Sequence, residues 1–418
     1  MSTESPFPYP IQYFSCKEHQ KDFALLPKDM QLLTTFCLGM GAVKGETGLP
    51  GVRLDFNGGL RLQIPAGDWH ITIGDHDSGM VFYDQDVSET ILISLEKYYI
   101  HWQIDIYFEK QLAFSHVFDP AGKKVRIVFW TGGMGIGDIL AALPYVREFQ
   151  RVCKAKVSYL VADSMKGLCQ RLLPEIPLQE KEDDDTYATY LMDAAFDAPA
   201  FSPLDGRMVP IQQLGQVVLG LSRAAPPLKW QAGPRKIKEP YVCIGVQASR
   251  AWKGWLYPGG WDAVIDYLKS MGYRVLCIDK DSKGKTGTVA MNRPLSAEDF
   301  TGNIPLTERA ELLSHADFFI GLSSGLSWLA ATVGCPAIML AGFTSHGFEF
   351  PFAYRVSNRL SCEGCCNDVR IPWPHKPCPR HAEDSDKYLE CSKKITPRMV
   401  IQTIDRLMED NHLRKNLL

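Results

Sequence analysis

Two glycine-rich turns carry the residues best suited to chemistry. The first runs from Thr131 to Asp138 and the second from Leu322 to Trp328, each directly after an apolar run. A buried strand that feeds a glycine turn and then a helix directs backbone N–H groups and a helix N-terminus at a phosphate. Two such turns in one chain indicate a nucleotide-sugar transferase more than a single-site binder. The predicted binding residues in these turns are Gly135, Gly137, Ser323, Ser324, Gly325 and Leu326.

Asp138 is the candidate general base. It follows the first glycine turn directly, where a carboxylate would point into a cleft between two domains. Sugar transfer needs a base that takes the proton from the acceptor hydroxyl. The same position also suits the N-cap of the following helix, and the sequence leaves both interpretations open.

A basic segment at the end of another predicted strand, Gln247 to Trp255, is the candidate site for the leaving group. Arg250 and Lys253 can offset the charge of a diphosphate at the carboxyl edge of a parallel sheet, and Gln247 begins the same turn. A surface lysine is the alternative interpretation of Lys253. Nearby tryptophans offer either a platform for a sugar or base, or ordinary core packing; they are Trp252, Trp255 and Trp261.

Five of the twelve cysteines gather near the C-terminus with a spacing that suits a metal. Cys362 and Cys365 form a CxxC knuckle, and twelve residues separate Cys365 from Cys378 and again Cys378 from Cys391. Four thiolates suit tetrahedral zinc or a single iron, and the spacing by itself favours zinc. Because four thiolates leave no open position for a substrate, the predicted role is structural. Cys366 either replaces Cys365 or stays a free thiol.

The loop around these cysteines contains several prolines and little helix or strand pattern, so a metal would hold it together. His375 and His381 lie in the same loop and are predicted to be surface groups. The other seven cysteines are scattered, several of them in apolar runs, and are predicted to be small reduced hydrophobes.

Two α/β units must position these residues. Apolar runs predict parallel strands at 125–130 and 157–162 in the first unit, and in the second at 241–246, 273–278, 317–320 and 337–340. Predicted helices lie between them, and a proline-rich linker at 225–240 joins the units. Two doubly wound domains that face each other across a cleft form the GT-B architecture. The predicted domains are 1–120, 121–235 and 236–418, with the metal finger at 360–393.

The region ahead of these units alternates with a period of two residues. Leu60, Leu62 and Ile64 resume the pattern of an earlier strand after an Asn57-Gly58-Gly59 turn, which predicts a small antiparallel sheet or barrel of its own. At the other end, 396–411 is predicted to be an amphipathic helix that packs back across the first α/β unit.

Composition narrows the function. A net charge of −3 gives no reason to expect nucleic-acid binding. Neither a secretory signal nor a run of roughly 20 apolar residues is apparent. We therefore expect a cytoplasmic protein without a membrane span.

Two stretches of sequence resemble a known family. The runs GGMGIGDILAALP and FTGNIPLTERAELLSHADFFIGLSSGLSWLAATVGCPAIMLAGFTS resemble the bacterial heptosyltransferases of glycosyltransferase family nine. Across the whole chain the sequence is closer to the autotransporter heptosyltransferases, which transfer heptose from ADP-heptose to serines of adhesin passenger domains. That branch has a β-rich N-terminal domain and a cysteine-bound iron, and both have counterparts here.

The resemblance implies roles for individual residues. It implies inverting transfer with Asp138 as the base and Lys253 at the phosphate, and adenine recognition near Gly302 and Leu340 to Thr344. It also implies ferric iron in the cysteine site in place of zinc, and a homo-oligomer in the form of a large ring.

One departure bears on the substrate. Lipopolysaccharide heptosyltransferases carry aspartate and threonine before Gly-Leu-Ser-His, whereas this chain reads Ser323-Ser324-Gly325-Leu326-Ser327-Trp328. The carboxylate that would hold sugar hydroxyls is missing, which disfavours a lipopolysaccharide-type reaction without excluding it. A non-catalytic nucleotide-binding redox sensor is the alternative from another class of function.

Overall fold

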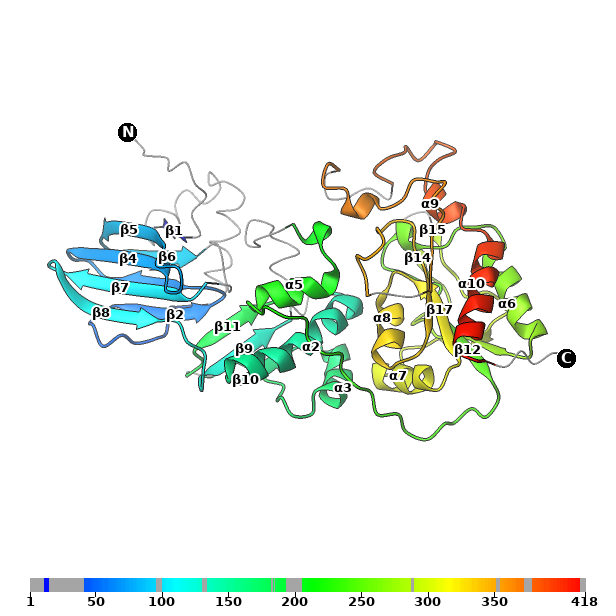
Figure 1. The fold of residues 1–418 in the computed structure, drawn as a ribbon, viewed down its shortest axis with the longest axis horizontal. Coiled ribbons are helices and arrows are strands. Elements are labelled where there is room, and N and C mark those ends of the chain that lie inside the picture. The colour runs from blue at the N-terminus through cyan, green and yellow to red at the C-terminus, as the bar shows by residue number, and fades with distance from the viewer. Residues whose placement is uncertain are drawn as a thin grey trace.

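The computed structural model arranges the chain as three parts along its long axis (Figure 1). The description covers residues 11–14, 41–94, 100–129, 134–181, 183, 185–192, 205–286, 289–350, 354–371 and 378–413. A β-rich part comes first, a small α/β unit follows, and a larger α/β unit carries the cysteine-rich loop. No helix among the described residues is long and apolar enough to cross a membrane.

The β-rich part contains antiparallel strands, as the two-residue alternation predicted. One sheet has the order β5-β4-β7-β8, and its strands are β4 (Trp69–Asp75), β5 (Val81–Val87), β7 (Trp102–Phe108) and β8 (Gln111–Val117). Ile71, Ile73, Ile104 and Ile106 are fully buried on one face of it. The predicted hairpin also forms, because β2 (Arg53–Asn57) pairs with β3 (Arg61–Ile64) across the Asn-Gly-Gly turn.

The β-rich part is continuous with the first α/β unit, which the sequence analysis did not foresee. Strand β2 pairs in parallel with β11 (Ala188–Leu191), so one sheet runs β1-β6-β3-β2-β11-β9-β10 through both parts. Its remaining strands are β1 (Ile11–Phe14), β6 (Thr90–Ser94), β9 (Lys124–Val128) and β10 (Lys156–Leu160). Because β2 and β11 belong to one sheet, the predicted domain boundary at residue 120 does not separate two independent sheets.

The first α/β unit has the predicted strand, helix, strand order. Strands β9 and β10 are parallel, with α2 (Ile136–Cys153) between them. The other helices of this unit are α3 (Asp163–Leu172), η3 (Gly206–Met208) and α5 (Ile211–Val218). The apolar side of α2 is buried against this sheet and α5, which holds the helix N-terminus at the carboxyl edge of the strands.

The second α/β unit is a parallel sheet with the order β16-β13-β12-β17-β18-β19. Its strands are β12 (Tyr241–Ile244), β13 (Arg274–Cys277), β16 (Glu298–Asp299), β17 (Phe318–Leu322), β18 (Ala337–Leu340) and β19 (Tyr354–Val356). Its helices are η4 (Ala251–Lys253), α6 (Gly260–Ser270), α7 (Leu306–Ser314) and α8 (Gly325–Thr332), and β14 (Lys285–Thr286) pairs with β15 (Val289–Ala290) in a separate ribbon. The strands predicted from apolar runs are all present.

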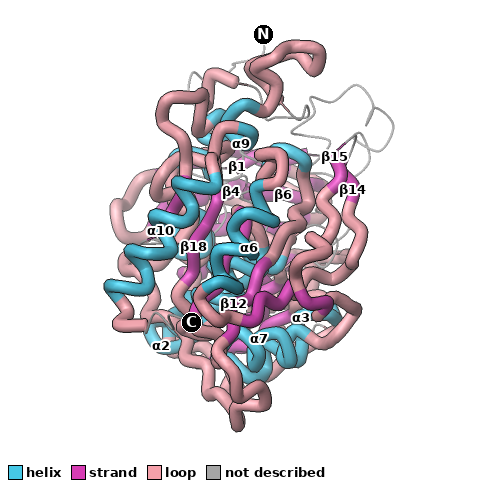
Figure 2. The backbone as a smooth tube through the Cα atoms, turned by 90° about the vertical axis from the view of Figure 1, so that its right-hand side faces the viewer, coloured by secondary structure: helices cyan, strands magenta, loops and turns pink. Residues whose placement is uncertain are grey.

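The C-terminal helix packs on the second unit, so the expectation that it crosses the first unit is wrong. Helix α10 (Pro397–Asp410) lies against α6 and β19, and Figure 2 shows α10 and α6 side by side. Val400, Ile404 and Leu407 have no exposed surface and belong to the core of this unit. Short helices η5 (Cys365–Asn367) and α9 (Glu390–Lys393) lie in the cysteine-rich loop just before it.

Candidate functional site

The two glycine turns meet where the α/β units adjoin. A side-chain carbon built on Gly137 would lie 2.6 Å from Trp328 Cδ1, and one built on Gly325 would lie 2.7 Å from Ile136 Cβ. Neither glycine can therefore carry a side chain unless its neighbour moves. The N-termini of α2 and α8 lie against each other, as two facing turns require. Residues 131–133 of the first turn fall outside the described residues.

Replacing Gly137 by alanine is expected to destabilise the protein by about 1–3 kcal/mol, because the added methyl group overlaps the Trp328 indole. Thermal unfolding measures the effect. Gly167→Ala in α3 is the matched control, since its methyl group would meet only Thr307 Cγ2 at 3.8 Å. A Gly137→Ala protein that unfolds at the wild-type temperature would contradict the close packing of the two turns.

Asp138 caps its helix, but from a different position than the sequence predicted. Gly135 is the N-cap of α2, and Asp138 is the third helical residue. Asp138 Oδ2 accepts a hydrogen bond from the Gly135 backbone N–H at 3.0 Å. The side chain is half-buried, at the end of α2 that touches α8. The capping contact fixes the carboxylate at the junction of the two units, where a base would have to be.

Lys253 reaches a crevice in the second unit. Helix η4 carries it, and the crevice walls include Ser323 at the end of β17 and the segment Ala341 to Phe343 after β18. Ligands of parallel α/β sheets bind at the carboxyl ends of the strands, which is where these residues lie. The half-buried ammonium therefore lies where it could contact a diphosphate.

The other candidates near this segment are an exposed arginine and three packed tryptophans. Arg250 is exposed, and its guanidinium lies 5.6 Å from the Trp252 ring, which makes a cation–π contact. Trp255 is buried, and its Nε1 donates to the Ile395 carbonyl at 2.8 Å. Its ring packs edge-on against Trp261 at 5.0 Å. Trp255 and Trp261 are thus packing residues, whereas Trp252 and Trp255 also contribute to one wall of the crevice.

Gln247 and Gly302 belong to a network that shapes the loops after β12 and β13. Asp279 is buried, which raises the pKa of its carboxyl, and it accepts a hydrogen bond from the Gln247 N–H at 3.2 Å. Gln247 Nε2 donates to the Asp281 carbonyl at 2.7 Å. Gly302, with a φ of 138°, turns its carbonyl to the buried guanidinium of Arg309. These contacts set the backbone of the predicted nucleoside-binding edge.

Ser323 and Thr344 join a buried carboxylate. Ser323 Oγ donates to Glu349 Oε1 at 2.7 Å, and Thr344 Oγ1 donates to the same oxygen. Glu349 Oε2 accepts from Arg355 Nη1 at 2.6 Å. Glu349 thus brings a carboxylate to Ser323 from a different segment of the chain, but its oxygens accept hydrogen bonds from Ser323, Thr344 and Arg355. The prediction that no carboxylate here holds sugar hydroxyls stays a prediction.

Helix α8 begins immediately after Ser323. Ser324 is its N-cap residue, but its side chain makes no capping hydrogen bond. Gly325 and Leu326 are the first helical residues, and Leu326 packs over Gly245. The first N–H groups of a helix have no partner within the helix, so this end offers donors for a phosphate.

The cysteine-rich loop brings several thiols near Cys391. Cys391 is buried, which raises the pKa of its thiol, and the thiols of Cys362, Cys365 and Cys378 raise it further. Burial also raises the pKa of Cys366, whose neighbours include Lys253 as well as the Cys365 thiol. Cys362, Cys365 and Cys378 are thus near Cys391, whereas Cys366 also lies near the lysine, and the four-cysteine ligand set stays a prediction.

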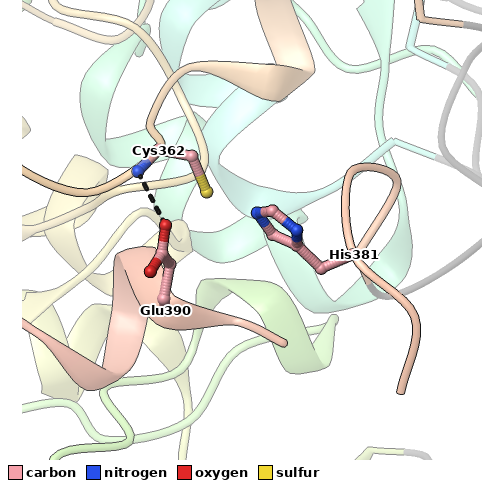
Figure 3. A group of neighbouring side chains, drawn as sticks. All are labelled: Cys362, His381 and Glu390. Carbon is pink, nitrogen blue, oxygen red and sulfur yellow. Dashed lines mark hydrogen bonds between the residues drawn. The ribbon is translucent and has the colours of Figure 1, made fainter. Parts of the chain in front are cut away.

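His381 lies beside this group, contrary to the prediction of a surface position (Figure 3). Ligand atoms of Cys362, His381 and Glu390 all lie within 4.8 Å of one another. Glu390 Oε1 accepts from the Cys362 backbone N–H at 3.3 Å. The turn after Cys378 folds back over the knuckle and brings the half-buried imidazole with it. His375 falls outside the described residues.

Comparison with known proteins decides the family. Two family models match, glycosyltransferase TibC, N-terminal domain, at residues 48–110, and glycosyltransferase family 9 (heptosyltransferase) at residues 209–378. Autotransporter heptosyltransferase BAHTCr of Citrobacter rodentium is 35% identical, over 90% of this chain and 93% of its own. This chain belongs to the autotransporter heptosyltransferases. It is therefore a glycosyltransferase by family.

Solved structures show the same fold as this autotransporter heptosyltransferase. The iron-containing dodecameric glycosyltransferase TibC from enterotoxigenic E. coli H10407 is 34% identical with a TM-score of 0.83, over 88% of this chain and 98% of TibC. Its complex with ADP-D-β-D-heptose gives a TM-score of 0.82 at 33% identity over the same shares of the two chains. The inactive autotransporter heptosyltransferase BimC of Burkholderia thailandensis is 31% identical, over 86% of each chain. The GT-B fold with an added β domain is thus confirmed.

Sequence reasoning about this autotransporter heptosyltransferase missed four charged residues near the predicted site. Glu349 lies between two phenylalanines, and Arg309 falls on the apolar side of α7, three residues after Leu306 and four before Leu313. A charged residue at a position that the pattern places in the core can be recognised from sequence as a member of a buried polar network, because a buried charge needs a partner. Asp279 and Arg355 each lie beside or within an apolar strand and carry the same signal.

Proposed function

We propose that this chain transfers heptose from ADP-heptose to serine hydroxyls of an autotransporter adhesin, with inversion at the anomeric carbon. The contact between the two glycine turns carries the proposal. It brings the start of α2, which carries Asp138, against the N-terminus of α8, in the unit that also holds the Lys253 crevice. The complex of TibC with ADP-D-β-D-heptose supports the choice of donor.

In the proposed reaction Asp138 takes the proton of the serine hydroxyl. The serine oxygen bonds to the anomeric carbon as the bond from that carbon to the diphosphate oxygen breaks, and ADP leaves with the bonding electron pair. Lys253 and the first N–H groups of α8 offset the charge on the leaving diphosphate. Arg250, Gln247, Gly302 and Thr344 contribute to donor binding in this proposal, the last three through the loops they order.

We propose one structural iron in the cysteine-rich loop. Its proposed ligands are Cys362, Cys365, Cys378 and Cys391, whose thiols act on one another, and zinc is the alternative metal. Four thiolates around a ferric ion supply cross-links for a loop that has few other supports. TibC is an iron-containing protein, which favours iron.

The remaining parts of the proposal concern partners. The β-rich part would hold the adhesin, the first α/β unit the base and the second the donor. A homo-oligomer in the form of a large ring is proposed because TibC is dodecameric. The reaction is placed in the cytoplasm, where donor and acceptor would meet before export.

The test is incubation of the purified protein with ADP-heptose and an unmodified adhesin passenger domain, followed by intact mass measurement. Added increments of one heptose, absent when ADP-heptose is omitted, are the expected result. Peptide mapping should place them on serines. A passenger of unchanged mass, with TibC active on its own passenger in parallel, would overturn the proposal.

A non-catalytic protein is the second candidate, because a relative at 31% identity is named inactive. Binding of ADP-heptose without any transfer to passenger domains would support it.

A further inference from the structure

A buried ion pair lies behind the Lys253 crevice and is not used by the proposed reaction. Side chains of Arg355 and Glu349 are 7% and 1% exposed and lie 2.6 Å apart. Arg355 Nη2 also donates to Thr344, at 2.6 Å to the carbonyl and 2.9 Å to Oγ1. The pair thus ties β19 to the loop that follows β18.

Stability alone is a weak reason for such a pair. Burial of two charges removes them from water, and packed apolar residues of the same volume often stabilise a fold as well or better. The pair instead fixes the orientation of neighbouring side chains, because each carboxylate oxygen of Glu349 accepts hydrogen bonds from defined donors. The alternative explanation for the buried pair is a specific role for the side chains that contact Glu349.

The hydrogen bonds of Glu349 fix the orientation of Ser323. An ionised carboxylate only accepts hydrogen bonds, so the proton of Ser323 Oγ points at Glu349 Oε1, 2.7 Å away. Ser323 and Lys253 line the same crevice. Because its proton is directed at Glu349, any further hydrogen bond of Ser323 Oγ is accepted, whereas a serine without this partner could rotate and donate.

We propose that Glu349 is a positioning residue for the nucleotide-sugar donor. It holds Ser323 Oγ as an acceptor for a hydroxyl group of the donor, and through Thr344 it fixes the loop after β18, whose residues Ala341 to Phe343 also line the crevice. This inference rests on the proposed donor. It adds Glu349, a residue that the sequence analysis did not assign to binding.

The test measures the dissociation constant of ADP-heptose by calorimetry, without acceptor, on the iron-loaded full chain. Glu349→Gln is expected to weaken binding by about tenfold, because one amide oxygen cannot serve the hydroxyls of Ser323 and Thr344 and the guanidinium of Arg355. Ser323→Ala should weaken it to a similar extent. The double variant should bind no more weakly than either single one, because both changes remove the same contact.

Asp55→Asn is the matched control, since Asp55 and Arg61 form another buried pair, 4% and 1% exposed, in the β-rich part. It should leave the dissociation constant unchanged, which separates a local effect from general loss of stability. Wild-type affinity in Glu349→Gln or Ser323→Ala, or additive losses in the double variant, would overturn the inference and leave the proposed function intact. If the wild-type protein does not bind ADP-heptose, the proposed function and the inference both fail.

Discussion

Replacement of Asp138 by asparagine is expected to lower the rate of transfer by about 10²- to 10⁴-fold while ADP-heptose binding is retained. Asparagine has an oxygen that can still accept the hydrogen bond from the Gly135 N–H, so the start of α2 should persist. It cannot take a proton from a serine hydroxyl. The measurement is the initial rate of mass increase of the passenger, together with the dissociation constant of ADP-heptose.

Measurement of both the transfer rate and ADP-heptose binding distinguishes a catalytic role of Asp138 from its role in capping α2. Asp138→Ala is the companion variant, because alanine removes both the base and the contact to Gly135, with an expected further loss of about 1 kcal/mol in folding stability. If Asp138→Asn transfers heptose at the wild-type rate while Asp138→Ala does not, the carboxylate serves only the helix, and another base must be sought.

The second large effect is expected from the cysteine-rich loop. Cys391→Ser should lower the metal content from the proposed one ion per chain to nearly none, since it removes one of the four proposed thiolate ligands, which is buried. The cysteine-rich loop should then become more mobile where it contacts other segments of the chain. Asn367 bridges two of these places, donating to the Arg207 carbonyl at 2.6 Å and accepting from the Ser345 N–H at 2.8 Å. Elemental analysis and hydrogen exchange at 205–211 and 343–348 measure the two effects.

Cys366→Ser is the matched control, because the Cys366 thiol is buried but lies among the charges of Lys253, Glu349 and Arg207. It should keep the metal. Loss of metal in Cys366→Ser, or full metal content in Cys391→Ser, would contradict the four-cysteine set. In that case, the metal content of His381→Ala shows whether the imidazole beside Cys362 is a metal ligand.

The sequence by itself determined the elements and their local contacts. Apolar runs identified β9 and β10 in the first α/β unit and β12, β13, β17 and β18 in the second, because a strand buried on both faces needs apolar side chains throughout. The Asn57-Gly58-Gly59 turn fixed the β2–β3 hairpin, and Thr396 followed by Pro397 fixed the start of α10. The spacing of the cysteines predicted a metal site in the C-terminal loop, and its ligand set stays a prediction. Each of these signals acts within one segment or between neighbouring segments.

The tertiary structure alone decided which distant segments meet. Nothing in the local pattern of β2 shows that its edge pairs with β11, about 130 residues later, or that α10 covers α6. The same holds for the site. Glu349 reaches Ser323 from another segment, and Trp328 leaves no space for a side chain at Gly137. Local backbone preferences and periodicity are short-range, whereas these contacts depend on which buried faces and charges find partners once the chain is compact.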